Sequence, residues 1–164
     1  MDMLLAALRD FPETLARHFA IIPPQWRDWA PPNWEGVPSE PYTAIAQLCH
    51  VRDIETDGYH VRFRRMLDEE MPVLAGVDGD RLVTERRYAK ADPADVIEAI
   101  RVARGATVEL LQGLNEAQLE RRGHFDGYGP VTVRGLMHYL CSHDQQHLAG
   151  LQWLAGKIAS QAAT

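Results

Sequence analysis

Two histidines close to the C-terminal end of the sequence have the residue type and spacing of a metal site. His143 and His147 stand four residues apart in the stretch "CSHDQQHLAG". On a helix they would lie about 40° apart around the axis and one turn apart along it, so both rings can reach one ion. They interrupt an apolar stripe of helical spacing and therefore replace leucines in a packing seam. The other members of this stripe are Leu136, Leu140, Leu151 and Leu154.

An apolar seam is an unfavourable place for two imidazoles. Their nitrogens must find partners there, and a divalent metal ion satisfies one nitrogen of each ring at once. A histidine pair with this spacing can also be hydrogen-bonded in the core or at the surface without any metal, and this alternative stays open. If a metal binds, a third ligand has to come from another helix, because two histidines are too few for a zinc-like ion.

His50 is the best candidate for the third ligand. It lies in the apolar stretch "AIAQLCHV" of a second expected helix. We therefore predict a metal site formed by His50, His143 and His147. Three histidines are the ligand count of a catalytic zinc-type site, which keeps one position open for water or substrate. The remaining histidines face away on their helices or have no definite position: His18, His60, His124 and His138.

Three carboxylates follow His50 closely in the sequence. Asp53 lies one helical turn on, and Glu55 and Asp57 lie a little further. They could orient an imidazole or act on a bound water. Each of them singly is better explained by ion pairing. The available partners on the same helix are Arg52, Arg62, Arg64 and Arg65.

The two cysteines, Cys49 and Cys141, are close in sequence to the proposed ligands but point about 100° and 200° away from them. We interpret both as core cysteines. Neither belongs to a CxxC pair, which suits a reducing compartment, and no disulfide is expected.

The elements that must position these residues are predicted to be helices. Pro12 is expected to kink or interrupt the first of them. The sequence Ser-Glu-Pro at 39–41 is typical of a helix start, and Asp92 and Thr132 are expected to cap later helices. Helices are expected over residues 3–20, 39–70, from 92 through 111, 115–121 and 132–155.

Long helices without alternating strands predict an all-α protein, an antiparallel four-helix bundle that folds as one domain over residues 1–164. The sites of such bundles lie between facing helices. The Pro- and Trp-rich residues 21–41 are expected to form a loop that covers one end of the core. "VLAGVDGDRL" is expected to be a turn-rich connection and "GHFDGYGPVT" a glycine-rich loop with room for a short extended piece.

Composition and charge exclude several classes of protein. The chain is 46% hydrophobic with a net charge of −6, and it contains no block of Lys and Arg. A nucleic-acid partner is therefore not expected. The first 19 residues break their apolar run with charges, so neither a signal peptide nor a membrane span is expected there. We expect a cytoplasmic protein with a small-molecule substrate.

These stretches resemble a known family. The combination of "AIAQLCHVRDIE" with "GPVTVRGLMHYLCSHDQQHLAGLQWL" is similar to the DinB/YfiT-like superfamily, and the resemblance covers nearly the whole chain, including the Trp/Pro loop and "ERRYAKADP". It implies a four-helix bundle, usually a homodimer, whose metal is held by one histidine of the second helix and by the HxxxH of the fourth. Those positions match His50, His143 and His147 in this sequence.

The resemblance also implies a class of chemistry. Characterised members include thiol transferases that use bacillithiol, a maleylpyruvate isomerase that uses mycothiol, and a metal-dependent hydrolase. We therefore expect an enzyme with a divalent transition metal, zinc or nickel first, that transfers a small thiol to an electrophile. Hydrolysis is the alternative reaction. A non-catalytic metal-binding stress-response protein and an interaction module without metal remain as alternatives from other classes.

Overall fold

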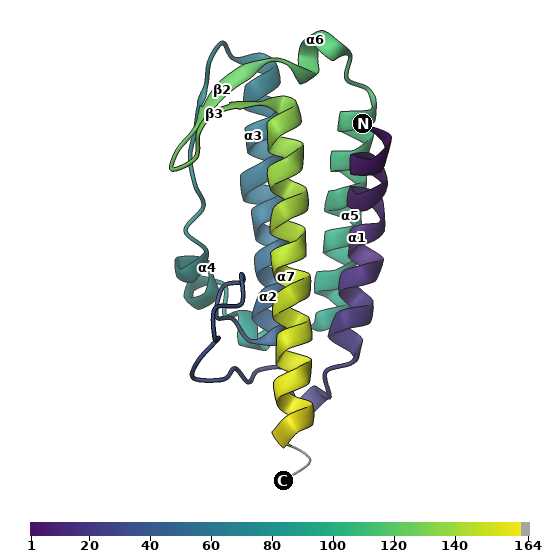
Figure 1. Cartoon of the computed structure of the whole chain (residues 1–164), viewed down its shortest axis with the longest axis vertical. Helices are drawn as coiled ribbons and strands as arrows, with labels where there is room; N and C mark the ends of the chain where they lie inside the picture. The colour runs from purple at the N-terminus through teal and green to yellow at the C-terminus, as the bar shows by residue number, and fades with distance from the viewer. Residues whose placement is uncertain (162–164) are drawn as a thin grey trace.

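Four long helices form the body of the protein (Figure 1). The computed structural model describes residues 1–161, so the last three residues of the predicted domain, 162–164, lie outside the described part. Helix α1 packs against α5 and α7, and α2 packs against the same two helices, which closes a ring of four. The all-α four-helix bundle predicted from the sequence is confirmed. The helices are α1 (Asp2–Ala20), α2 (Ala44–Asp53) with its continuation α3 (His60–Asp68), α5 (Pro93–Gln112) and α7 (Val133–Gln161).

A single π-helical turn, η2 (Ile54–Tyr59), joins α2 to α3, so the two form one continuous rod. Figure 1 shows that α1 and α7 run downward and that α2–α3 and α5 run upward. Because α3 and α5 run in the same direction, the chain between them must return along the whole bundle. This connection contains β1 (Val73–Leu74), α4 (Gly79–Glu85) and η3 (Tyr88–Lys90).

A small sheet crosses the upper end of the bundle. Strands β2 (Arg122–Phe125) and β3 (Gly129–Thr132) form an antiparallel hairpin, and β1 pairs with β2 in parallel. Gly127 and Gly129 have φ values of +80° and +89°, which glycine adopts without strain at this turn. The hairpin occupies the stretch that was predicted as a glycine-rich loop. It follows the short helix α6 (Glu116–Leu119), which lies in the predicted helix 115–121 and begins with a capping box formed by Asn115 and Gln118.

The ends of the helices agree with the sequence in part. Asp92 caps α5, and the Thr132 hydroxyl accepts a hydrogen bond from the backbone N–H of Gly135. The predicted start of the second helix at residues 39–41 is wrong, because Thr43 caps a helix that begins at Ala44. The last helix continues to Gln161 rather than ending near residue 155, since Ile158 is buried in the core.

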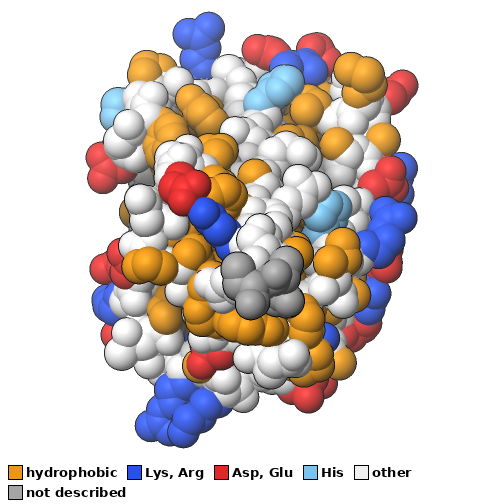
Figure 2. Space-filling model, turned by 60° about the horizontal axis from the view of Figure 1, so that its bottom comes forward, with side chains coloured by type: hydrophobic (Ala, Val, Ile, Leu, Met, Phe, Trp, Pro, Cys, Tyr) orange, Lys and Arg blue, Asp and Glu red, His pale blue; other side chains and the backbone are white. Residues whose placement is uncertain are grey.

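The connection between α1 and α2 covers the lower end of the bundle, where it includes the 3₁₀ turn η1 (Pro24–Trp26). Trp26, Trp29 and Trp34 are partly buried against the core, as their predicted covering role requires. Figure 2, which brings this end forward, shows hydrophobic side chains among interspersed acidic and basic ones. Within residues 1–161, no helix is both long and apolar enough for a membrane span.

A buried charge cluster links the helices at mid-height. Arg104 of α5 is 1% exposed and binds the carboxylates of Glu55 and Asp144, with nitrogen–oxygen distances of 2.7 to 3.1 Å. It also donates to the backbone carbonyl of Leu8 in α1 at 3.1 Å. The ion-pair interpretation of Glu55 therefore holds, although its partner comes from α5 rather than from its own helix. One guanidinium thus contacts all three of the other long helices.

Replacement of Arg104 with methionine tests this cluster. The variant leaves the carboxylates of Glu55 and Asp144 buried without a counter-charge. We expect Arg104→Met to lower the free energy of unfolding by about 3 to 5 kcal/mol, measured by urea denaturation. Arg101→Met changes an exposed arginine of the same helix α5, which pairs with Glu13 of α1 and with Glu98, and it should leave the free energy of unfolding nearly unchanged. Equal losses in the two variants would contradict the role assigned to the cluster.

Candidate metal centre

The three histidines that the sequence singled out meet at one point between α2 and α7. The Nε2 atom of His143 lies 3.0 Å from Nε2 of His147 and 3.3 Å from Nε2 of His50. His50 and His147 are buried, and His143 is partly exposed where it lines a pocket. The structure therefore brings all three predicted ligands together with the same ring nitrogen facing inward.

Two glycines allow this close approach. A Cβ atom on Gly79 of α4 would lie 2.7 Å from Cε1 of His50, so the backbone of α4 covers that ring directly. A Cβ atom on Gly150 of α7 would lie 3.0 Å from Nε2 of Gln47. The absence of side chains at both positions lets α4 and α2 pack against the histidines.

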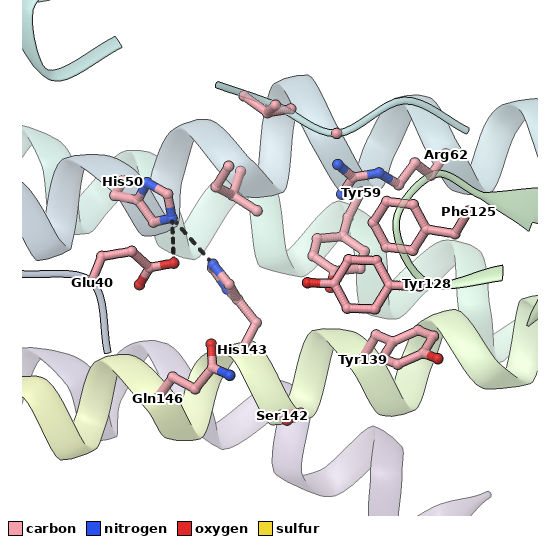
Figure 3. A pocket seen from close by; sticks show the side chains of 13 residues that line it. Glu40, His50, Tyr59, Arg62, Phe125, Tyr128, Tyr139, Ser142, His143 and Gln146 are labelled. Carbon is pink, nitrogen blue, oxygen red and sulfur yellow. Dashed lines mark hydrogen bonds and ion pairs between the residues drawn. The ribbon is translucent and has the colours of Figure 1, made fainter. Parts of the chain in front are cut away.

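Glu40 is a fourth member of the cluster, and the sequence did not reveal it. Its Oε2 lies 3.6 Å from Nε2 of His147 and its Oε1 lies 3.9 Å from Nε2 of His50. The four side chains offer ligand atoms that lie within 4.8 Å of one another. Glu40 belongs to the irregular segment before α2, so no helical spacing relates it to the histidines. Figure 3 shows its carboxylate pointing toward His50.

Gln47 holds His147 in one orientation. Nδ1–H of His147 donates to Oε1 of Gln47, and the Gln47 amide nitrogen donates to the hydroxyl of Ser39 at 3.1 Å and to the backbone carbonyl of Glu40 at 3.0 Å. Because Nδ1 of His147 carries the hydrogen, its Nε2 presents a lone pair to the cluster. A hydrogen bond of this kind on the outer nitrogen is typical of metal-binding histidines.

The surroundings keep the imidazoles neutral, which is the form that binds metals. Burial, together with the nearby charges of His50, Arg104 and Arg62, lowers the pKa of His143 to about 3. Burial also lowers the pKa of His147 well below its ordinary value. The pKa of His50 is lowered by burial, although nearby carboxylates oppose this change.

The contacts among these groups fit a bound cation. A hydrogen on Nε2 of His143 can point at only one of its two neighbours, whereas a cation accepts a lone pair from each ring. The Oε2 atom of Glu40 is buried without a hydrogen-bond partner among the described residues, and it faces the same point. The three imidazoles form a donor set that suits zinc or nickel, and the Glu40 carboxylate lies beside it.

The other residues considered from the sequence lie away from this point. Asp53 binds Arg52 and Arg86 and accepts a hydrogen bond from Tyr88. His60 contacts the Ala103 carbonyl of α5. Both cysteines are free thiols within residues 1–161. Burial raises the pKa of each cysteine to about 11, so neither is a ready nucleophile. His138 is exposed on α7 and faces away from the histidine stripe, the direction that was expected.

A pocket of about 200 Å³ opens beside the histidines. Glu40, His50 and His143 lie at one end of the view in Figure 3, and aromatic side chains lie at the other. Phe125 and Tyr128 of the hairpin line it, whereas none of the tryptophans does. The hairpin therefore borders the cavity, and the Trp-rich segment 21–41 contributes only Glu40 to its lining.

Replacement of His147 tests whether the three histidines bind a metal. We expect wild-type protein without an affinity tag to take up one equivalent of zinc or nickel, and His147→Ala to abolish this uptake, measured by elemental analysis after gel filtration. His138→Ala changes an exposed histidine of the same helix and should keep full uptake. Retained metal in His147→Ala would refute the ligand set.

The hydrogen bond from His147 to Gln47 gives a finer test. Gln47→Leu keeps the side-chain volume but removes the acceptor of Nδ1–H. We expect the zinc affinity to fall by about 10- to 100-fold while the stoichiometry stays at one, as measured by competition with a fluorescent chelator. An unchanged affinity would show that the hydrogen bond does not support the site.

Comparison with known proteins agrees with this fold. Among solved structures, YfiT from Bacillus subtilis matches with a TM-score of 0.83 and 20% identity, over 96% of this chain and 87% of that chain. That protein is described as a probable metal-dependent hydrolase with an unusual four-helix bundle topology. No curated protein matches the sequence. The family model of the DinB superfamily matches residues 7–151. The chain therefore belongs to the DinB superfamily.

Proposed function

We propose that the protein is a metal-dependent enzyme in which a divalent ion, held by His50, His143 and His147, activates a small nucleophile. The observation that carries this proposal is the convergence of three neutral imidazoles at the wall of a pocket. A site meant only to stiffen the bundle would be closed to solvent and to small molecules. Here His143 and Glu40 both line the pocket, so a ligand can reach them.

The residues around the pocket have separate roles in this proposal. When bound, a zinc-like ion lowers the pKa of a thiol or a water molecule near it. The carboxylate of Glu40 accepts the proton that the nucleophile loses, because it is the free base closest to His50 and His147 in the pocket. Gln47 orients His147, and the aromatic wall keeps water away from the electrophile.

The nucleophile that we place first is a small thiol. Its thiolate forms a carbon–sulfur bond to a small electrophile, the leaving group of the electrophile departs, and Glu40 takes the proton of the thiol. The resemblance to thiol transferases supports this choice. A thiolate is also the more available nucleophile at neutral pH, since a thiol has a pKa of about 8.5 and water is a far weaker acid. The thiol has to be supplied as a cosubstrate, because Cys49 and Cys141 do not line the pocket.

Hydrolysis is a second candidate, and Glu40 is the observation that favours it. Water needs a base more than a thiol does, and a carboxylate beside the histidines supplies one. The described activity of the Bacillus subtilis protein points the same way. The two reactions therefore differ in how strongly they should depend on Glu40.

Glu40→Gln separates the two reactions. With zinc-loaded protein, we expect hydrolysis of p-nitrophenyl acetate to fall by about 100-fold or more if water is the nucleophile. Conjugation of N-acetylcysteine to monobromobimane should fall by less than about 10-fold, because the thiol ionises more readily. Both rates are measured above the uncatalysed rate. The faster of the two reactions in the wild-type protein identifies the chemistry that the site favours.

Two controls accompany this experiment. Glu35→Gln alters an exposed glutamate of the same connection, which pairs with Lys157, and should leave both rates unchanged. His147→Ala gives the rate without the metal site. The decisive comparison is between metal-loaded wild-type protein and His147→Ala. If the two proteins have equal rates in both reactions, the enzymatic proposal fails and a non-catalytic metal-binding protein is favoured.

We also infer a homodimer, from the resemblance to the superfamily, and a reducing compartment such as the cytoplasm. The support for a reducing compartment is that Cys49 and Cys141 are both free thiols. Zinc or nickel remains the metal that we propose, because imidazole ligands suit both.

A further inference from the structure

A second buried arginine, Arg62 of α3, lacks the partners that such a group normally has. It is 5% exposed. Within residues 1–161, no carboxylate forms an ion pair with it, and the acceptor of its hydrogen bonds is the backbone carbonyl of Ala75, at 3.1 and 3.2 Å. Arg104, the other deeply buried arginine, has two carboxylate partners. Burial of a cation without a counter-ion is costly, so Arg62 calls for an explanation.

Several features of the fold hold Arg62 in this position. Its guanidinium carbon lies 4.5 Å from the centre of the Phe125 ring and 5.1 Å from that of Tyr59. A Cβ atom on Gly58, in the π-helical turn, would lie 2.8 Å from Nη1 of Arg62. Gly58 therefore makes room for the guanidinium, and two aromatic rings partly offset its desolvation. These contacts position the cation but leave its charge unneutralised.

The guanidinium lines the same pocket as the histidines. Figure 3 shows Arg62 beside Tyr59 and Phe125, on the far side of the pocket from Glu40 and His50. The pocket therefore has a metal-binding end, a cationic end and aromatic walls between them. A molecule that fills about 200 Å³ can touch both ends at once.

We propose that Arg62 binds a carboxylate group of the substrate, so that the enzyme acts on small carboxylic acids with a flat or apolar body. The planar guanidinium matches a planar carboxylate, and its one charge neutralises one carboxylate. Tyr59 and Phe125 pack against the body of the molecule, while its reacting group lies at His50, His143 and His147. The statement that the enzyme acts on carboxylic acids rests on the proposed function. The binding of a carboxylate to Arg62 does not depend on it.

Binding of benzoate and of its neutral isostere benzamide tests the inference. Dissociation constants are measured by NMR titration of both zinc-loaded and metal-free protein, because a metal could also attract the carboxylate. We expect benzoate to bind the wild-type protein about tenfold more tightly than benzamide, or better, in both forms. Arg62→Gln should bind the two probes equally when metal-free. Arg64→Gln, an exposed arginine on the same helix, should keep the wild-type preference.

A merely structural Arg62 would give a different pattern. Its replacement would lower the melting temperature but leave the preference for benzoate over benzamide intact, which would overturn the proposal. Arg62→Lys keeps the charge without the planar pair of donors, and it should retain a reduced preference even if the Gln variant is too unstable to study. Failure of metal-free wild-type protein to prefer benzoate would also overturn the proposal.

The outcomes separate this inference from the proposed function. Zinc uptake and catalysis without a preference for benzoate would refute the carboxylate site alone. A preference for benzoate that depends on Arg62, in a protein that takes up no metal, would refute the proposed metal-dependent enzyme while the carboxylate site stands.

Discussion

The contact on which the rest of the structure depends is the burial of Arg104 between two carboxylates. A buried guanidinium is tolerated only where its charge and its N–H groups are matched, so the positions of Glu55, Asp144 and the Leu8 carbonyl are tightly constrained. These groups belong to three different helices. Hydrophobic packing alone would tolerate small rotations of each helix about its axis. The Arg104 cluster restricts these rotations, because they would break its ion pairs and hydrogen bonds. Asp144 directly follows His143 in α7, so the same contact sets the direction in which His143 points.

The geometry of the histidine cluster depends on the fixed orientation of these helices. Three neutral imidazoles lie together because burial disfavours their protonated forms, and because glycines at 79 and 150 let neighbouring segments approach them. The irregular segments complete the site. Glu40 comes from the connection before α2, Gly79 from the return connection, and Phe125 and Tyr128 from the hairpin. The helices hold the three histidines, and the connections form the other sides of the pocket beside them.

Arg104 and Arg62 show two uses of the same side chain. Both are almost fully buried, but two carboxylates neutralise Arg104, whereas no carboxylate of the described residues pairs with Arg62. The first arrangement stabilises the bundle. The second leaves a cation beside a pocket whose other end is lined by imidazoles and a carboxylate, which is an arrangement suited to orienting a small molecule with one negative end.

The amino-acid sequence by itself determined the helices, the bundle and the three converging histidines. Periodic spacing reveals His143 and His147 because both lie on one helical stripe, and His50 because its neighbours in the chain are apolar. Such patterns record which face of a helix is buried. They contain no information about segments without a period. For this reason the start of α2 is misplaced and the short helix α4 is missed, and the sequence predicts only a loop with room for a short extended piece where the hairpin forms.

Only the tertiary structure decided the partners of the charged groups. Glu40 joins the histidines, Glu55 pairs with an arginine 49 positions away, and Arg62 has no counter-ion among residues 1–161. Each of these facts depends on which helices are neighbours and how they are rotated. Any of several nearby arginines could have neutralised Glu55, so the sequence left the choice open. The free-energy cost of burying a charge without a partner selects Arg104 as the partner of Glu55. That cost arises only when the helices have packed.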